Sequence, residues 1–266
     1  MKGRVLIIAG SDSGGGAGIQ ADIKAVTALD GYAMTAITAL TAQDTRGVHG
    51  VLPVPTDFIR QQIRLVLDDL GADAVKTGML ATAEVIEAVA AELAPLAGRV
   101  PVVVDPVMVA KGGHRLLVEN AIQAVLTRLL PLADLLTPNA PEAEALTGLP
   151  VRSPEEMRAA AARLRSFGAK AVLMKGGHLD GPVVTDLLVT AAGETCFTGE
   201  RVDTPHTHGT GCTLASAIAC GLAQGLAPTD AVARARRYVE IAIRTAPGYG
   251  HGHGPLNHSH TVTPFR

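Results

Sequence analysis

Short apolar runs, many of them β-branched, alternate with longer amphipathic stretches along most of the chain. RVLIIAG at residues 4–10 precedes GIQADIKAVTALD, and the alternation recurs as far as KAVLMKGG at residues 170–177. Strands that are apolar throughout, separated by amphipathic helices, are typical of a parallel sheet covered on both faces. The pattern therefore predicts a doubly wound α/β fold.

The later part of the chain departs from this alternation. GPVVTDLLVT and ETCFTGERV are separated only by AAG, which predicts an antiparallel hairpin. Two helices are expected after it, from Cys212 to about Ala227 and from about Thr229 to Ala246. The first is apolar on nearly every side, which predicts burial. No break in composition marks a second domain, so residues 1–266 are expected to form one domain.

Composition narrows the classes of function. The 266 residues are 47% hydrophobic and carry a net charge of -2, so no overall positive field favours nucleic acid or an anionic membrane. No apolar run reaches the roughly 18–20 residues of a membrane span, and the N-terminal run ends at Gly10, too early for a signal peptide. The three cysteines lack the close spacing of a zinc cage or disulfide framework. A soluble, cytoplasmic protein is expected.

Polar residues follow the apolar runs at six places along the chain. These places are Ser11 with Asp12, Gln43 with Asp44, Lys76, Asp105, Asn139 and Lys175. In open α/β sheets, ligands bind outside the carboxyl ends of the strands. The six places together predict a lined cleft at that edge, where an active site is expected.

The glycine-rich stretch SDSGGGAGIQAD begins at the first of these ends. It follows a strand and opens a helix, an arrangement that brings backbone N–H groups close to a ligand. Ile19 occupies the third glycine position of the dinucleotide fingerprint, and the Lys-Ser/Thr of a P-loop is missing, so an NAD-dependent dehydrogenase is disfavoured. Backbone contact to a small substrate is the preferred role, and a flexible turn is the alternative.

Two strand-end residues have both a chemical and a simpler interpretation. The carboxamide of Gln43 can donate and accept, so it can pair with the amino group and ring nitrogen of an aminopyrimidine, although an ordinary loop residue explains it as simply. The carboxylate of Asp105 could position Mg²⁺ or its water shell. A turn initiator before Pro106 accounts for Asp105 equally well.

The segment TPNAPEAEAL predicts a capping box. Asn139 stands at the N-cap and Glu142 at the third helical position, an arrangement that stabilises a helix by about 1 kcal/mol. Capping is the default role, and Glu142 facing a hydrated Mg²⁺ is the functional alternative. Lys175, which ends an apolar strand and precedes two glycines, suits contact with phosphate.

HGTGCT, residues 208–213, carries the strongest chemical signal. Gly209, Thr210 and Gly211 are expected to expose successive N–H groups at a helix N-terminus, which makes a hollow for an anion such as a transferring phosphoryl group. The helix dipole is expected to lower the pKa of the Cys212 thiol. A thiol there could accept the proton of an incoming hydroxyl. His208 could order the loop by hydrogen bonding.

The C-terminal HGHGPLNHSH contains paired histidines. His251 and His253 have strand-like spacing, but no acidic or thiol partner lies near them in the sequence. Zinc requires a fuller ligand set, so a structural or solvated role is predicted for this segment.

Taken together, these segments resemble the hydroxymethylpyrimidine/phosphomethylpyrimidine kinase family of thiamine biosynthesis, within the ribokinase-like superfamily. The resemblance covers essentially the whole chain. The segments that carry it are AGSDSGGGAGIQADIK, ITALTAQDTRGV, VKTGMLAT, VVVDPVMVAKGG, LLTPNAPEAEALTG, AVLMKGGH, THGTGCTLASAIA and GHGPLNH. It implies a three-layer α/β/α fold with a mostly parallel central sheet and a small flap.

The resemblance also implies an activity and a site. Members of this family phosphorylate 4-amino-5-hydroxymethyl-2-methylpyrimidine with ATP and Mg²⁺, first to the monophosphate and then to the diphosphate. Cys212 stands where related sugar kinases carry the aspartate base. The implied contacts are Gln43, Gly10, Asp22 and Met79 with the pyrimidine, Gly209, Thr210 and Gly211 with the transferring anion, Asn139, Lys175, Thr210 and Gly211 with the nucleotide, and Asp105 and Glu142 with Mg²⁺.

Two alternatives stay open beside this interpretation. A pyridoxal kinase of the same branch acts on a ring that also presents a hydroxymethyl group. A non-catalytic pyrimidine-binding regulator could keep the fold without the reaction, although the presence of Lys175, Glu142 and the GTGC loop argues against it. By analogy with the family, a homodimer is expected.

Overall fold

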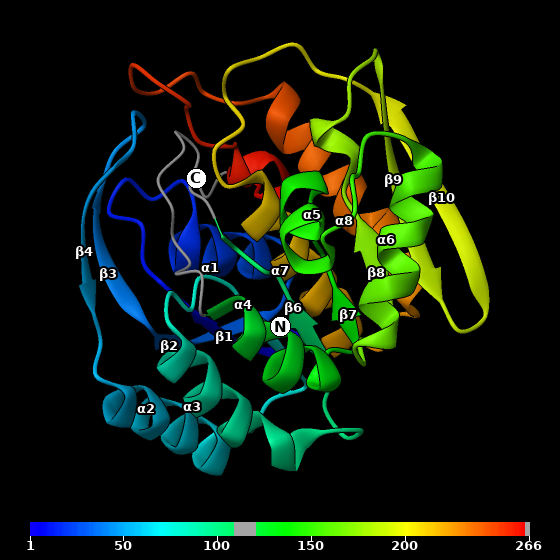
Figure 1. Ribbon diagram of the computed structural model, residues 1–266. Helices are drawn as coiled ribbons and strands as arrows, with labels where there is room; N and C mark the ends of the chain where they lie inside the picture. The colour runs from blue at the N-terminus through cyan, green and yellow to red at the C-terminus, as the bar shows by residue number, and fades with distance from the viewer. Residues whose placement is uncertain (109–120, 264–266) are drawn as a thin grey trace.

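A large, mostly parallel sheet forms the centre of the protein (Figure 1). The computed structural model describes residues 1–108 and 121–263, so the end of the VVVDPVMVAKGG motif, residues 109–113, lies outside the described residues. The strands of the sheet are β1 (Arg4–Ala9), β2 (Tyr32–Ile37), β5 (Ala74–Thr77), β6 (Val102–Val104), β7 (Leu135–Leu136), β8 (Val172–Met174), β9 (Val183–Thr190) and β10 (Gly193–Glu200).

The strand order is β10-β9-β8-β7-β6-β5-β1-β2, and every neighbouring pair from β2 to β8 is parallel. β9 pairs antiparallel with both β8 and β10, which confirms the predicted hairpin. The described α-helices are α1 (Gly18–Ala28), α2 (Thr56–Asp69), α3 (Ala83–Leu93), α4 (Ala121–Ala124), α5 (Ala140–Thr147), α6 (Pro154–Ser166), α7 (Thr210–Ala223) and α8 (Pro228–Arg244).

The sheet separates two hydrophobic cores, as a three-layer fold requires. Helices α1, α7 and α8 pack on one face, and α2 to α6 pack on the other (Figure 1). β1 shows why its sequence is apolar throughout: Leu6 and Ile8 enter one core, while Val5 and Ile7 enter the other, all fully buried. Each such side chain contributes about 1.5–3 kcal/mol of burial free energy. The predicted α/β architecture is confirmed.

The small flap is a separate two-stranded hairpin. The run MTAITALTA looks like one strand in the sequence, but the chain leaves the main sheet at Thr38 and continues as β3 (Ala39–Gln43), which pairs with β4 (Val48–Pro53). β2 ends there because β1, its only neighbour among the described strands, ends opposite it: Ile37 pairs with Ala9, the last residue of β1. Both halves keep a strand period of two, so the pattern could not reveal the crossing.

The two late helices match their predicted positions closely. α7 begins at Thr210, two residues before the predicted Cys212, and its residues from Thr213 to Gly221 are buried, as its apolar sequence predicts. Cys220 is among them and is a core residue. Within the described parts of the chain, no helix combines the length and apolarity needed to cross a membrane.

A buried ion pair joins the sheet to two helices on one face. Nζ of Lys76, on β5, lies 3.0 and 2.9 Å from the two carboxylate oxygens of Asp22, on α1. Ser216, on α7, donates its hydroxyl to the same carboxylate at 2.7 Å. Burial alone would lower the pKa of Lys76, but the adjacent carboxylate of Asp22 outweighs it and raises that pKa above its ordinary value. The Lys76 ammonium is therefore charged and fixed in position, although burial also raises the pKa of Asp22 in spite of the neighbouring ammonium.

Removing one member of this pair should cost much more stability than removing an exposed ion pair. Asp22→Ala leaves the Lys76 ammonium uncompensated in the core, and we expect a loss of about 3–5 kcal/mol in the free energy of unfolding. Glu155→Ala is the matched control, because Glu155 pairs with Arg158 on the surface, where we expect less than about 1 kcal/mol. Urea denaturation measures both, and similar losses would contradict the assignment.

Candidate active site

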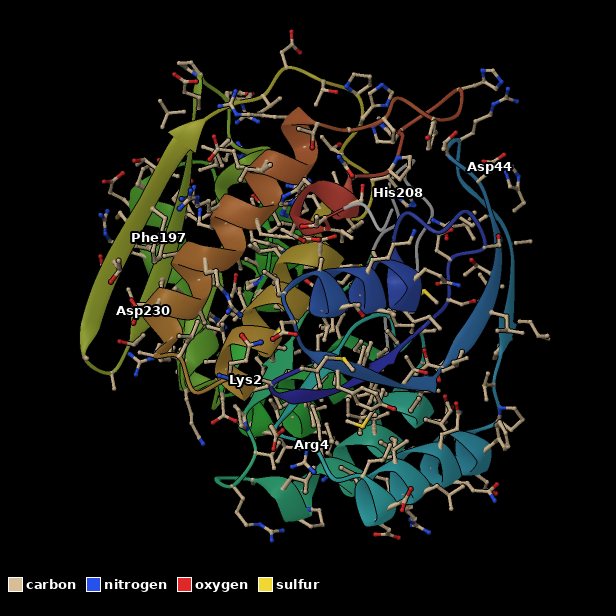
Figure 2. The ribbon with its side chains drawn as sticks, turned by 180° about the vertical axis from the view of Figure 1, so that it is seen from behind. Lys2, Arg4, Asp44, Phe197, His208 and Asp230 are labelled. Atoms are coloured by element: carbon tan, nitrogen blue, oxygen red, sulfur yellow. The ribbon has the colours of Figure 1, made fainter. Side chains whose placement is uncertain are left out.

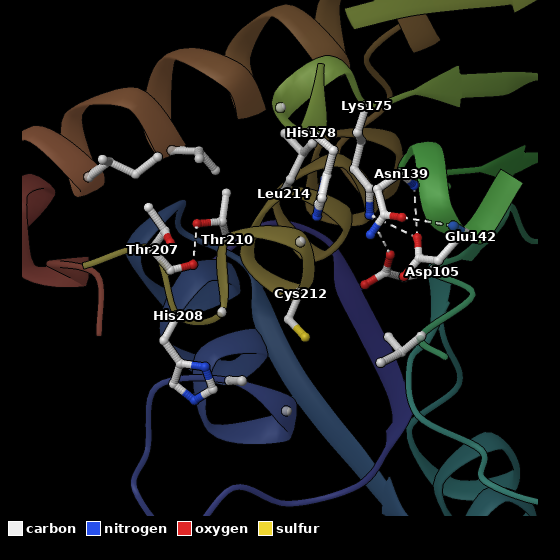
Figure 3. A pocket seen from close by; sticks show the side chains of 18 of the residues that line it. Asp105, Asn139, Glu142, Lys175, His178, Thr207, His208, Thr210, Cys212 and Leu214 are labelled. Carbon is white, nitrogen blue, oxygen red and sulfur yellow. Dashed lines mark hydrogen bonds and ion pairs between the residues drawn. The ribbon is translucent and has the colours of Figure 1, made fainter. Parts of the chain in front are cut away.

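A cavity of about 790 Å³ lies at the carboxyl ends of the parallel strands (Figure 3). Residues from all six predicted places line its wall; five of the places belong to strands of the central sheet or follow them closely, whereas Gln43 ends β3 of the flap. Those that line it are Ser11, Asp12, Gln43, Lys76, Asp105, Asn139 and Lys175, while Asp44 does not. The first turn of α7 forms the central part of the cavity wall, and Cys212 faces into the cavity.

The glycine-rich turn before α1 is held by one carboxylate. Asp12 accepts the backbone N–H groups of Gly14, Gly16 and Ala17 at 2.8, 3.0 and 2.8 Å. Nε2 of His208 lies 2.8 Å from the same carboxylate. Burial would raise the pKa of Asp12, but these hydrogen bonds outweigh it and hold that pKa below its ordinary value. These bonds fix the shape of the turn, and the His208 ring, which was expected to order the anion loop, instead joins that loop to the glycine-rich turn through Asp12.

The anion loop and the glycine-rich turn touch through their backbones. Gly209 has φ of +80°, and a Cβ at this position would lie 1.8 Å from the carbonyl oxygen of Gly16. No side chain can replace glycine there without moving one of the two loops. Sequence reasoning identified each loop alone, and their contact depends on the tertiary structure.

The first turn of α7 faces the ammonium group of Lys175. Thr210 donates its hydroxyl and, more weakly, its N–H to the carbonyl of Thr207, at 2.7 and 3.3 Å. The N–H groups of Gly211 and Cys212 lie in the first turn of the helix, where backbone N–H groups have no intrahelical acceptor. A Cβ at Gly211 would lie 3.4 Å from Nζ of Lys175, so the absence of a side chain keeps the space between them open. Amides and an ammonium group thus meet around one hollow, as an anion site requires.

The pKa of Cys212 differs from the sequence-based expectation. The helix dipole was expected to lower it, but burial raises the pKa of this thiol to about 12. Lys76 and the backbone N–H of Gly18 act in the opposite direction, and the carboxylates of Asp22 and Asp105 reinforce the rise. The expectation was wrong because desolvation and two neighbouring anions outweigh the dipole. At neutral pH Cys212 is therefore a protonated thiol.

An acidic and basic cluster forms the opposite side of the cavity (Figure 3). Nζ of Lys175 lies 2.9 Å from Oδ1 of Asp105 and 3.7 Å from Oε2 of Glu142. The predicted capping box is confirmed: Asn139 accepts the N–H of Glu142 at 2.9 Å, and Glu142 accepts the N–H of Asn139 at 2.8 Å. Although burial would lower the pKa of Lys175, the two carboxylates raise it, so the ammonium stays charged.

Glu142 therefore both caps α5 and faces the cavity. Burial raises its pKa to about 7, partly offset by Lys175. The donor set fits a hydrated Mg²⁺, which takes one or two protein carboxylates and completes its shell with water and phosphate oxygens. Asp105 and Glu142 are the residues that would hold such an ion.

The residues expected around a pyrimidine ring lie on the flap side. Gly10, Gln43 and Met79 line the cavity, and a Cβ at Gly10 would lie 2.4 Å from the methyl carbon of Met79. Nε2 of Gln43 lies 3.3 Å from Nε2 of His208. Asp22 is fully buried and does not belong to the cavity wall, since Lys76 covers it. Its contact with a ring stays a prediction.

Several wall residues escaped sequence reasoning. In the sequence, Asp12 stood out only as a polar residue after a strand. Its bonds to the glycine-rich turn and to His208 become visible only in the folded structure. On the far side, the wall includes Arg201 to Thr204 after β10, and Arg236, Val239 and Ile243 on one side of α8. Nothing in the local pattern of α8 distinguishes these residues from an ordinary packed helix face.

Comparisons with known proteins agree on one family. The family described as Phosphomethylpyrimidine kinase matches residues 12–257. A hydroxymethylpyrimidine/phosphomethylpyrimidine kinase of Streptomyces coelicolor is 50% identical over 254 residues, covering 96% of this chain and 93% of that protein. The thiamine biosynthesis bifunctional protein ThiED of Geobacter sulfurreducens is 54% identical over 97% of this chain, which spans only 52% of that protein.

Solved structures show the same fold. Bacillus subtilis pyridoxal kinase, as an ADP complex, aligns with a TM-score of 0.90 at 38% identity, over 97% of this chain and 98% of that chain. The phosphomethylpyrimidine kinase of Clostridium difficile aligns with a TM-score of 0.80 at 41% identity, over 91% and 100%. Staphylococcus aureus pyridoxal kinase with AMP-PCP and pyridoxal aligns with a TM-score of 0.89 at 37% identity, over 97% and 94%.

Gly209→Ala should test the contact between the two loops. The matched control is Gly225→Ala, because Gly225 has φ of +85° but nothing within 4 Å of an added Cβ. The control incurs only the backbone strain of about 1–2 kcal/mol. Gly209→Ala also forces the Gly16 carbonyl to move, so we expect it to lose at least about 3 kcal/mol more. Chemical denaturation measures the difference, and equal losses would contradict the contact.

Glu142 should give stability a distinctive pH dependence. Its pKa is raised from 4.5 to about 7 on folding, so between these values the folded protein holds a proton that the unfolded chain has released. Stability from this group is therefore lost as pH rises through that window. In Glu142→Gln, which keeps an oxygen to cap Asn139, this fall should disappear. Free energies of unfolding of both proteins from pH 5 to 8 measure it, and parallel curves would argue against the shift.

Proposed function

Because this chain belongs to the phosphomethylpyrimidine kinase family, we propose that it phosphorylates 4-amino-5-hydroxymethyl-2-methylpyrimidine with ATP, in thiamine biosynthesis. The monophosphate is then phosphorylated again to the diphosphate. The observation that carries the proposal is the arrangement around the start of α7. There, the first turn of α7, Lys175 and the Cys212 sulfur surround one space between Gln43 on the flap and the carboxylates of Asp105 and Glu142.

The two sides of the cavity suit different substrates. Gly10, Gln43 and Met79 would contact the pyrimidine, while Asn139, Lys175, Thr210 and Gly211 would contact the nucleotide phosphates. Nucleotide complexes of structural neighbours support the use of ATP. The amides of Gly209 to Gly211 would stabilise the charge that develops on the γ-phosphoryl group during in-line transfer. Mg²⁺ held by Asp105 and Glu142 would neutralise phosphate charge.

In the first reaction a P–O bond forms to the substrate hydroxyl, the bond from the γ-phosphorus to ADP breaks, and the hydroxyl proton must leave. Cys212, which is mostly a protonated thiol at neutral pH, would accept that proton through its small thiolate fraction, which Lys76 favours and the neighbouring carboxylates oppose. Because phosphoryl transfer passes through a loose transition state, the hydroxyl proton leaves late in the reaction. In the second reaction the acceptor is already an anionic phosphate, so no such base is needed.

A pyridoxal or pyridoxine kinase is the second candidate. It is favoured by the structural neighbours named pyridoxal kinase, which align over 97% of this chain. The pyrimidine is preferred because the family match and the curated relatives carry that activity in their names. Values of kcat/KM for both alcohols, measured side by side, separate the two candidates.

Three further expectations belong to the same proposal. One ribokinase-like domain over residues 1–266 is supported by the single large sheet, whose strands come from residues 4 to 200. A cytoplasmic homodimer is expected by analogy with the family. Light scattering coupled to gel filtration gives the mass in solution, and a monomer at micromolar concentration would contradict the dimer.

The function can be tested by mass spectrometry of the products. The purified protein is incubated with ATP, Mg²⁺ and, separately, the hydroxymethylpyrimidine, its monophosphate, pyridoxal and ribose. Phosphate should be added to the pyrimidine and then again to its monophosphate. No pyrimidine product, together with efficient phosphorylation of pyridoxal, would establish the second candidate instead.

Cys212→Ala should separate the two phosphorylations. We expect the first to lose roughly 10²–10⁴ in kcat, the usual contribution of a general base, and the second to lose less than about tenfold. In the unmutated protein the first reaction should also accelerate from pH 7 to 9, since a thiol with a pKa of about 12 becomes steadily more ionised. Steady-state rates with each acceptor measure this. Equal losses, or a flat pH profile, would exclude Cys212 as the base.

A further inference from the structure

The C-terminal segment crosses the tip of the flap. Residues 250–255 run beside the turn that joins β3 to β4, although some 200 residues separate them in sequence (Figures 1 and 2). The backbone N–H of His253 donates to the carbonyl of Thr45 at 2.7 Å. The hydroxyl oxygen of Thr45 accepts the N–H groups of His251 and Gly252, each at 3.2 Å. We call these three contacts the Thr45 clasp.

Gly250, Gly252 and Gly254 are required because this segment passes too close to Thr45 and His206 for a side chain to fit. A Cβ at Gly252 would lie 2.2 Å from the carbonyl oxygen of Thr45, and one at Gly250 would lie 2.4 Å from the Thr45 side chain. A Cβ at Gly254 would lie 2.4 Å from the ring of His206. The histidines between them were considered as metal ligands in the sequence, but it is their backbone that makes the contacts with Thr45.

The same segment also holds the loop before α7. The N–H of His208 donates to the carbonyl of Gly254 at 3.2 Å, and His208 forms a β-bridge with Pro255. Nδ1 of His253 lies 3.1 Å from the carbonyl of Pro205. A single stretch of chain therefore joins the flap turn to the loop that carries the anion hollow.

Gln43 and His208 lie between these two attachment points. Gln43 ends β3, two residues before Thr45, and its amide nitrogen lies 3.3 Å from the His208 ring. β4 is exposed along nearly its whole length, so the flap is held mainly through β3. There Thr41 donates its hydroxyl to the Ser11 carbonyl at 2.8 Å, and the Ser13 hydroxyl donates to the Gln43 carbonyl and accepts the Gln43 N–H, both at 2.8 Å. Beyond Gln43, the clasp holds the tip of the flap.

We propose that Thr45 is a positioning residue for the pyrimidine substrate: through the clasp, the C-terminal segment fixes Gln43 and His208 relative to each other. The inference rests on the proposed function, since it assigns Gln43 to the acceptor side of the cavity. The nucleotide side, with Asn139 and Lys175, lies across the cavity from His208 (Figure 3). Loosening the clasp therefore weakens acceptor binding and leaves nucleotide binding intact.

Thr45→Val and Thr45→Ser form a matched pair for the test. Valine has nearly the shape of threonine but cannot accept the two N–H groups, whereas serine keeps the accepting oxygen. Because both accepted N–H groups lose their partner, Thr45→Val should raise KM for the pyrimidine alcohol roughly 5–150-fold. Its KM for ATP and its kcat should change less than about twofold. Thr45→Ser should stay within about twofold of the unmutated protein in all three.

Gly252→Ala provides an independent variant, because its added Cβ displaces the Thr45 carbonyl without altering any side chain of the flap. It should raise the same KM, again without a matching change for ATP. Melting temperatures of all variants show whether they remain folded at the assay temperature.

The outcomes separate the two proposals. If the unmutated protein phosphorylates the pyrimidine but Thr45→Val leaves its KM unchanged, or raises both KM values equally, the clasp has no positioning role. If Thr45→Ser is as impaired as Thr45→Val, the accepting oxygen is not the cause, and the inference is again overturned. If the unmutated protein phosphorylates no pyrimidine, the proposed function itself fails.

Discussion

The buried pair of Lys76 and Asp22 is the interaction on which the site most depends. It joins β5 to α1 and, through Ser216, to α7, so the glycine-rich turn and the anion loop start from helices attached to one point. Its ammonium group lines the cavity, and its charges act on the Cys212 thiol in opposite directions. A buried pair of this kind gains little net stability over apolar packing, yet it fixes the position of its partners when both are present.

Close backbone contacts also fix the positions of the loops around the site. Gly209 against Gly16, and Gly252 against Thr45, bring main chains together at distances that exclude any side chain. Such contacts bring the polar groups of one loop within reach of the other, as the 2.8 Å contact between His208 and Asp12 shows. The result is an anion hollow built mostly from backbone, whose geometry does not depend on flexible side chains. Preorganised amides of this kind are effective in stabilising developing charge.

The side of the cavity that holds Lys175, Asp105 and Glu142 is built from charged side chains instead of backbone. Lys175 lies near two carboxylates, and burial of Glu142 keeps its pKa near neutrality. The bond from the Asn139 N–H holds the Glu142 carboxylate in place. A neighbouring cation such as Lys175 still lowers the pKa of that carboxylate. The capping and metal-binding interpretations of Glu142 are therefore compatible, since one carboxylate has oxygens enough for both.

The sequence by itself determined the layered α/β architecture, the late hairpin, the capping box at Asn139 and the gathering of polar strand ends. These features follow from periodicity or from bonds between residues a few positions apart, and parallel strands necessarily bring their carboxyl ends to one edge. It could not show that MTAITALTA divides between two sheets, because both halves have the same period.

Only the tertiary structure decided the high pKa of Cys212, the ordering of the glycine-rich turn by Asp12 and His208, the burial of Asp22 beneath Lys76, and the crossing of the C-terminal segment over Thr45. Desolvation and contacts between residues about 200 positions apart depend on which surfaces meet after folding, and no local pattern encodes them.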